Sequence, residues 1–94
     1  MAEQQSNGRI TAGDAIRSAR ALVEEMTAKP TESVSGIARC ESGGWEVSID
    51  VVELSRVPPS TDLLSTYEVV LDPEGDLVDM TRARRFVRGQ ADEE

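Results

Sequence analysis

The stretch Trp45-Glu46-Val47-Ser48-Ile49-Asp50-Val51-Val52-Glu53-Leu54 decides how this chain folds. Apolar residues occupy every second position from Trp45 to Val51, and polar residues occupy the positions between them. A period of two is typical of a β-strand with one buried and one solvated face, so we predict a strand with Trp45 as a core anchor. Val52 and Leu54 fall on the opposite parity, which indicates either a bulge or an end covered on both faces.

Upstream of this strand, an apolar face recurs at steps of three or four residues, which is the period of an amphipathic helix. Its members are Ala12, Ala15, Ile16, Ala19, Leu22, Val23 and Met26. Thr11 is placed to be the N-cap, and Asp14 completes an aspartate version of the capping box. Pro30 lies just beyond the predicted end of the helix. Arg20 and Glu24 have the spacing of a surface ion pair.

Three further strands are expected. Ser33 to Cys40 alternates poorly, but Ser42-Gly43-Gly44 joins it to the Trp45 strand as a hairpin turn. Tyr67 to Leu71 alternates cleanly. It continues through Asp72-Pro73-Glu74-Gly75, which has the composition of a type I turn, into a returning strand at Leu77 to Met80.

Two segments connect or extend these strands. Val57-Pro58-Pro59 ends the second strand, because proline cannot donate to a sheet ladder. Ser60-Thr61-Asp62 then predicts the cap of a short helical turn through Leu63-Leu64. The segment from Arg82 to Arg88 either prolongs the last strand or forms a short helix.

Together these elements predict an α+β fold, in which an N-terminal amphipathic helix packs on a three- or four-stranded antiparallel sheet. A short C-terminal helix is the alternative for the end of the chain. We place one domain at residues 10–88, between a flexible tail at 1–9 and an acidic flexible tail at 89–94.

Composition limits the class of protein. The 94 residues carry a formal net charge of −8, and 30% of them are charged. No apolar run approaches the roughly 20 residues of a membrane-spanning helix, and the first nine residues lack the apolar segment of a secretory signal. An acidic surface also repels a phosphate backbone. We therefore expect a cytoplasmic domain whose partners are neither nucleic acid nor membrane.

The residues of metal and nucleophile chemistry are scarce. The chain has no histidine and one cysteine, Cys40. The usual zinc ligand sets and a histidine-dependent triad therefore cannot form. Cys40 is expected to be a small buried apolar residue, because no histidine is present to activate it. The turn at Asp72 lacks the ligand spacing of a calcium loop. We expect no catalytic residue, no cofactor and no metal.

A cluster of arginines near the end of the chain is the main candidate site. Arg82, Arg84, Arg85 and Arg88, with Phe86 among them, concentrate positive charge in an otherwise acidic chain. Guanidinium groups form planar hydrogen-bonded pairs with carboxylates, so the cluster predicts a docking surface for an acidic partner. Arg82, Arg85 and Arg88 are the expected partner-facing charges, and Phe86 either packs beneath them or inserts into the partner.

An ordinary solvated face is the alternative interpretation. The arginines then pair internally with Glu68, Asp76 or Asp79, and such surface pairs contribute little to stability. Nucleic-acid binding is a weaker alternative, because the remaining charge opposes it and the cluster holds one aromatic residue.

The acidic side chains could suggest paired carboxylates for acid–base catalysis. Because they alternate with apolar residues, we expect them to be the solvated face of the strands, with no pocket to shift their pKa values. The six side chains are Glu46, Asp50, Glu53, Asp62, Glu68 and Asp72.

Taken in order, several short motifs over residues 10–88 resemble the gas vesicle protein O (GvpO) family. They are a tryptophan-led strand (Gly44-Trp45-Glu46-Val47), a Glu-Leu-x-Arg-x-Pro segment (Glu53 to Pro58), an Asp-x-x-x-x-Tyr-Glu-Val strand (Asp62 to Val69), a glycine turn (Gly75-Asp76-Leu77) and an Arg-x-x-Arg-aromatic-x-Arg ending (Arg82 to Arg88). Their order and spacing carry the resemblance, while the predicted helix matches only in character.

The resemblance implies an accessory role in forming gas vesicles, the gas-filled protein shells that give some prokaryotes buoyancy. It implies association with gas vesicles in the cytoplasm, with other gas vesicle proteins, shell or assembly components, as partners. It supplies no catalytic residues. We expect a non-enzymatic module that works through protein–protein contacts; the alternative is a regulator of gas vesicle gene expression, or of a neighbouring assembly ATPase, through protein binding. Pairing of the Ser33–Cys40 strand with its copy would give a homodimer.

Overall fold

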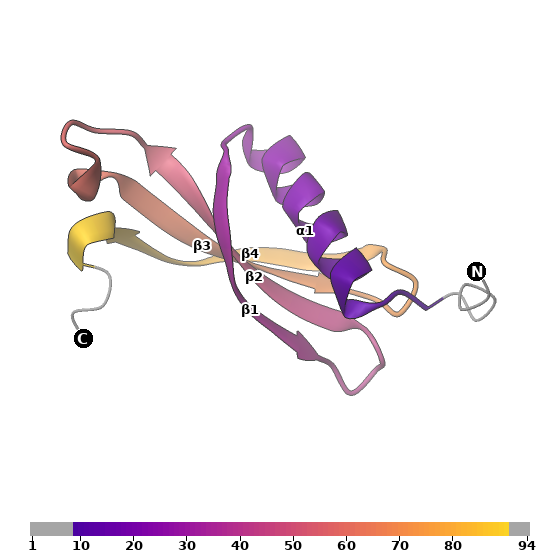
Figure 1. Ribbon diagram of the computed structural model, residues 1–94. Coiled ribbons are helices and arrows are strands. Elements are labelled where there is room, and N and C mark those ends of the chain that lie inside the picture. The colour runs from indigo at the N-terminus through magenta and orange to yellow at the C-terminus, as the bar shows by residue number, and fades with distance from the viewer. Residues whose placement is uncertain (1–8, 91–94) are drawn as a thin grey trace.

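A computed structural model describes residues 9–90 as one helix followed by a four-stranded antiparallel sheet (Figure 1). Its elements are α1 (Ala12–Thr27), β1 (Thr31–Arg39), β2 (Trp45–Leu54), the 3-10 turn η2 (Pro59–Thr61), β3 (Leu63–Leu71), β4 (Leu77–Val87) and the 3-10 turn η3 (Arg88–Gln90). The strands lie in sequence order, so β1 and β4 are the two edges. The predicted α+β fold is confirmed. The predicted tails fall almost wholly outside the described residues.

The capping box at the start of α1 is present as predicted. The Asp14 amide donates to Thr11 Oγ1 (3.1 Å), and the Thr11 amide donates to Asp14 Oδ2 (3.3 Å). The expected ion pair between Arg20 and Glu24 is wrong, because both side chains turn to Thr31. Arg20 donates to the Thr31 hydroxyl (3.1 Å), which in turn donates to Glu24 Oε2 (3.0 Å). The helix is thereby tied to the first residue of β1.

The core forms where α1 crosses the middle of the sheet. The buried helix residues are Ala15, Ala19 and Val23, and they pack on Val47, Ile49, Val51, Val69 and Leu71. Small residues on the helix let it lie close to the sheet. Trp45 is 8% exposed and donates its indole N–H to the carbonyl of Ile10 (3.3 Å). The prediction that Trp45 anchors the core is confirmed.

The start of β3 differs from the sequence prediction. The helical turn lies earlier, at Pro59–Thr61, and Leu63 and Leu64 already belong to the strand. Asp62 does not cap a following helix, because its carboxylate accepts the preceding Arg56 amide (2.7 Å). The chain therefore leaves Asp62 extended, with Leu64 buried.

The hairpins confirm the predicted turns. Cys40 closes the first hairpin by donating its amide to the Gly44 carbonyl (2.9 Å). The expectation that the Cys40 side chain is buried is wrong, because it is half-buried. In the second, Asp72 Oδ1 accepts the amides of Glu74 and Asp76, each at 2.9 Å. After that turn β4 runs to Val87, so the arginine segment prolongs the strand and only then forms a short 3-10 turn.

The helix covers only part of the sheet. An α-helix of 16 residues is about 24 Å long, whereas a strand of 11 residues such as β4 extends about 36 Å. Figure 1 shows the loop between β2 and β3, together with η2 and η3, beyond the helix. We call this region, residues 52–64 and 85–90, the far end of the sheet. None of the helices in the described part of the chain is long and apolar enough to cross a membrane.

Gly44 lies so close to the backbone of Leu71 that adding one methyl group there should strongly destabilise the fold. A Cβ on Gly44 would lie 2.0 Å from the carbonyl oxygen of Leu71. We expect Gly44→Ala to lower the free energy of unfolding by about 2–4 kcal/mol, because β2 and β3 must shift apart. Chemical denaturation measures the change. Gly13→Ala is the control, since its Cβ would be in ordinary contact with two side chains, Arg17 at 3.6 Å and the Thr11 hydroxyl at 3.9 Å. Equal effects of the two substitutions would contradict this packing.

Candidate functional site

The predicted arginine cluster lies along edge strand β4 and is divided between the two faces of the sheet. Residues paired across neighbouring antiparallel strands share a face. Arg82 pairs with Tyr67 and Arg85 pairs with Ser65, which places both arginines on the face that carries α1. Phe86 pairs with Leu64 on the opposite, open face. A bulge in β4 between Arg82 and Arg84 keeps Arg82 and Arg85 on the same side.

Arg82 belongs to a polar cluster centred on Glu53. Glu53 Oε2 accepts hydrogen bonds from Ser65 Oγ (2.6 Å) and Tyr67 OH (3.5 Å), and it lies 3.5 Å from Arg82 Nη1. The Glu53 side chain is 11% exposed, whereas that of Arg82 is 46% exposed. Arg82 is therefore held at its inner side by Glu53 and remains accessible from outside.

The pKa of Glu53 is lowered, chiefly by the hydrogen bond from Ser65. Burial acts in the opposite direction, and the positive charges of Lys29, Arg82 and Arg85 add to the lowering. Glu53 thus stays ionised although little of it reaches solvent. The prediction that Glu53 belongs to the solvated face is wrong. Glu53 has the parity of the buried residues Trp45 to Val51, and it is the unpaired residue of the β2 register shift, so its carboxylate turns to Ser65 on the helix side.

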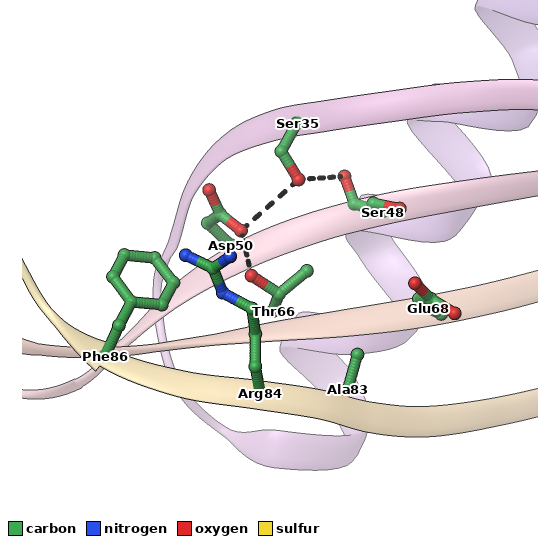
Figure 2. Close-up of a pocket in the computed structure, with 8 residues that line it drawn as sticks. All are labelled: Ser35, Ser48, Asp50, Thr66, Glu68, Ala83, Arg84 and Phe86. Atoms are coloured by element: carbon green, nitrogen blue, oxygen red, sulfur yellow. Dashed lines mark hydrogen bonds between the residues drawn. The ribbon is translucent and has the colours of Figure 1, made fainter. Parts of the chain in front are cut away.

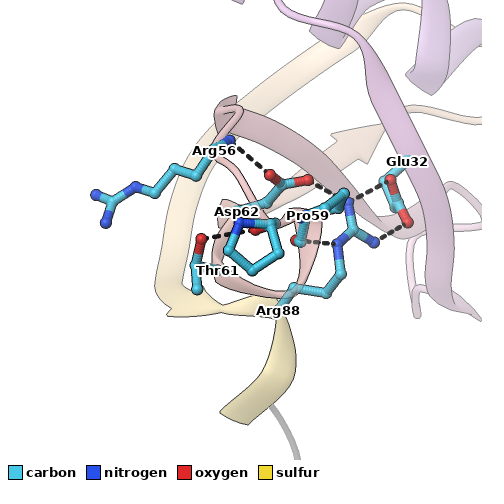
Figure 3. Close-up of polar contacts among 7 residues, drawn as sticks. Glu32, Arg56, Pro59, Thr61, Asp62 and Arg88 are labelled. Atoms are coloured by element: carbon cyan, nitrogen blue, oxygen red, sulfur yellow. Dashed lines mark hydrogen bonds and ion pairs between the residues drawn. The ribbon is translucent and has the colours of Figure 1, made fainter.

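Arg88 lies at the centre of a second polar cluster (Figure 3). Its guanidinium donates to Glu32 Oε2 (2.5 Å), to Asp62 Oδ2 (2.9 Å) and to the carbonyl of Pro59 (3.3 Å). Its backbone amide donates to the Asp62 carbonyl (2.9 Å). One side chain therefore joins the bulge of β1, the loop before β3 and the end of β4.

The carboxylates around Arg88 have lowered pKa values. For Asp62 the main cause is the hydrogen bond from the Arg56 amide, followed by the hydrogen bond from Arg88. For Glu32 the hydrogen bond from Arg88 is the main cause, and Arg88 itself has a raised pKa. Asp62 is 7% exposed, so its predicted place on the solvated face is also wrong. Asp62 lies inside because its carboxylate accepts hydrogen bonds from the preceding Arg56 amide and from the distant Arg88 guanidinium.

Two of the four arginines, Arg82 and Arg88, do pair internally, but with other carboxylates than the sequence suggested. The expected partners Glu68, Asp76 and Asp79 are replaced by Glu53 for Arg82, and by Glu32 and Asp62 for Arg88. Within residues 9–90, Arg84 and Arg85 form no ion pair. Arg84 instead lies over the ring of Phe86, 4.4 Å from its centroid. The positive charge on β4 that is not neutralised within this part of the chain is therefore that of Arg84 and Arg85. Arg82 is paired with Glu53 but remains partly exposed.

The open face of the sheet carries a shallow polar pocket of about 280 Å³ (Figure 2). Asp50 accepts hydrogen bonds from Thr66 (2.6 Å) and Ser35 (3.4 Å) at its base. The lining residues are Ser35, Ser48, Asp50, Thr66, Glu68, Ala83, Arg84 and Phe86. Asp50 and Glu68 thus lie on the solvated face as predicted, but the expectation that no pocket surrounds these carboxylates is wrong. Among the described residues there is no group of acidic, cysteine or histidine side chains arranged to hold a metal ion.

A family model described as "Gas vesicle synthesis protein GvpO" matches residues 1–92. The chain belongs to this family. It is 44% identical over 77 residues to gas vesicle protein O of a Streptomyces species, an alignment that covers 82% of this chain and 59% of the relative. It is 28% identical over its whole length to gas vesicle protein O of Haloferax mediterranei, of which 67% is covered.

A third relative is gas vesicle protein O1 of Halobacterium salinarum, 36% identical over 61 residues, or 63% of this chain and 51% of the relative. The chain thus spans about half to two thirds of the length of the curated relatives that it matches. No solved structure matches it.

The motif residues that suggested this family meet in the two polar clusters. Glu53, Tyr67 and Arg82 form the first with Ser65, and Asp62 and Arg88 form the second. Sequence reasoning missed Ser65 and Glu32. A buried Ser65 had a weak signal, since it shares parity with Tyr67 and Val69 on the apolar side of β3. Nothing in the sequence pointed to the contact between Glu32 and Arg88, because the two residues lie 56 positions apart.

The lowered pKa values predict how stability depends on pH. Because the folded pKa values of Glu32 and Asp62 lie below their ordinary values of 4.5 and 3.8, the stabilisation is fully present above about pH 5. It is lost as pH falls through the folded values. We expect Arg88→Gln to lower the Tm at pH 7 by roughly 5–10 °C, and to lower it much less at pH 3. Circular dichroism melts of both proteins from pH 7 to pH 3 measure the difference. A Tm gap that stays constant over this range would contradict the role of the cluster.

Proposed function

We propose that this chain is a non-catalytic accessory factor in gas vesicle formation that works by binding other gas vesicle proteins. The family description supports the role in synthesis, and the exposed arginines of β4 support the contact mechanism. A chain with 30% charged residues and a mean hydropathy of −0.36 is also unlike a shell subunit, which must present continuous apolar surface to gas.

The arrangement of arginines on β4 is the observation that carries the proposal. β4 is an edge strand, and its exposed arginines Arg84 and Arg85 have no ion-pair partner within residues 9–90. This positive edge belongs to a chain with a net charge of −8. Guanidinium groups in such a position bind carboxylates of a partner and accelerate its approach.

Each of the predicted site residues has its own part in this proposal. Arg85 and the exposed side of Arg82 face the partner from the helix side of the sheet, and Phe86 supports Arg84 on the open face. Arg88 is engaged by Glu32 and Asp62, so its contribution is to fix the end of the strand. The partner is an acidic surface of a shell or assembly component.

A homodimer through β1 is a separate proposal. β1 is the other edge strand, as the dimer requires. Its ladder is interrupted by register shifts at Glu32 and Ser35, which leave only the segment from Gly36 to Arg39 in unbroken register. Such bulges discourage edge-to-edge pairing. Light scattering at two protein concentrations tests the dimer: a mass that doubles supports it, and a constant monomer mass refutes it.

Charge reversal on β4 tests the contact mechanism. We expect Arg84→Glu with Arg85→Glu to abolish vesicles, or to reduce their number at least tenfold, when it replaces the wild type in a cell deleted for the gene. Electron microscopy counts the vesicles. The matched control reverses Arg9 and Arg17, which are exposed away from β4 and change the net charge equally. Normal vesicles with the β4 variant would contradict the mechanism, and normal vesicles in the deletion itself would contradict the role in synthesis.

A further inference from the structure

The loop between β2 and β3 presents an apolar side chain to solvent. We call residues 54–59 the tip loop. Val57 is 96% exposed, the highest value among the large apolar residues in the described part of the chain, and Leu54 in the same loop is 50% exposed. Pro58 and Pro59 next to them are exposed as well. A single exposed apolar residue is ordinary, but four within six positions form an apolar tip.

The backbone on both sides of Val57 is held in place. The Arg56 amide donates to Asp62 Oδ1 (2.7 Å). The Pro58 carbonyl accepts from the Thr61 hydroxyl (2.7 Å) and the Thr61 amide (3.0 Å), and the Pro59 carbonyl accepts from Arg88 (3.3 Å). These contacts surround the loop in Figure 3. An apolar group that is already fixed loses little conformational entropy on binding, which is the condition for an efficient anchor.

The charge beside this anchor indicates the chemistry of its partner. Figure 3 shows the Arg56 side chain pointing away from Asp62, although its amide is bound there. The Arg56 guanidinium forms no ion pair within residues 9–90. A tip with one exposed cation next to Val57 complements an apolar pocket bordered by carboxylates. A single cation is not enough to bring a chain with a net charge of −8 to an anionic membrane.

We infer that the tip loop is a second docking site, at which Val57 enters an apolar pocket on another gas vesicle protein and Arg56 pairs with a carboxylate at its rim. This inference rests on the proposed role in vesicle formation. It concerns residues other than Arg84 and Arg85, because Arg56 and Val57 belong to the loop that follows β2, although Arg85 also lies at the far end of the sheet. The Arg88 cluster supports it by fixing the loop rather than by touching the partner.

The experiment uses the purified proteins encoded with this chain in one gas vesicle gene cluster, each titrated in turn by calorimetry. We expect one of them to bind the wild type, Val57→Asp to weaken that binding about tenfold or more, and Arg56→Glu to weaken it and reduce its salt dependence. Val78→Asp is the matched control, since Val78 is 61% exposed at the opposite end of the sheet. The affinity of this variant for the partner should stay within about twofold of that of the wild type.

A photo-reactive residue at position 57 locates the contact on the partner so identified. The inference requires that the cross-linked peptide contain apolar residues next to Asp or Glu. Val57→Ser provides a second variant if Val57→Asp fails to fold by circular dichroism, and it too should weaken binding.

Two results would overturn the inference. One is unchanged affinity of the Val57 and Arg56 variants for every protein of the cluster. The other is co-sedimentation with phosphatidylglycerol vesicles that the Val57 substitution abolishes, because the tip would then recognise a lipid surface. Either result is distinguishable from failure of the proposed function, since vesicle loss on gene deletion and on reversal of Arg84 and Arg85 is measured independently.

Discussion

A helix that is shorter than the sheet beneath it sets the main constraint on this protein. α1 buries Ala15, Ala19 and Val23 against one half of β2 and β3, from Trp45 to Val51 and from Val69 to Leu71, and the other half extends beyond it. Without apolar cover, the far end needs other interactions to stay ordered. Arg88 supplies them, because its guanidinium and amide connect Glu32, Asp62 and Pro59. The Glu53 cluster marks the boundary between the covered and the uncovered half.

In the proposed function, this division separates stability from recognition. The apolar core under α1 sets most of the stability, since burial of apolar surface is the dominant favourable term in folding. The two proposed contact surfaces lie where the helix does not reach, on the edge of β4 and on the tip loop. Both are attached to the polar clusters, through Arg82 and Glu53 in one case and through Arg56 and Asp62 in the other. A small domain can thus present two rigid surfaces without enlarging its core.

Local patterns in the sequence were enough to predict the covered half. The alternation after Trp45, the pairing of Thr11 with Asp14 and the turn at Asp72 each depend on neighbouring residues, and the structure agrees with all three. The far end could not be predicted in the same way. Asp62 has the sequence context of a helix cap, yet it accepts an amide from the preceding loop.

The same reason accounts for the candidate site. The sequence showed that arginines gather between Arg82 and Arg88, but not that a bulge in β4 places Arg82 and Arg85 on one face. It could not show that Glu32 neutralises Arg88, because this contact joins segments brought together only by the complete sheet. Long-range ion pairs leave no periodic signal, whereas helices and strands do.

Amide hydrogen exchange, followed residue by residue in the isolated protein, tests most directly whether Arg88 keeps the uncovered end ordered. The amides of Arg56 and Arg88 both donate to Asp62, through its side chain and its carbonyl respectively. At pH 7 they should exchange far more slowly than an open loop, and Arg88→Gln should remove this protection while the amides of β2 under α1 stay protected. Rapid exchange of both amides in the wild type, or unchanged protection in the variant, would contradict the account.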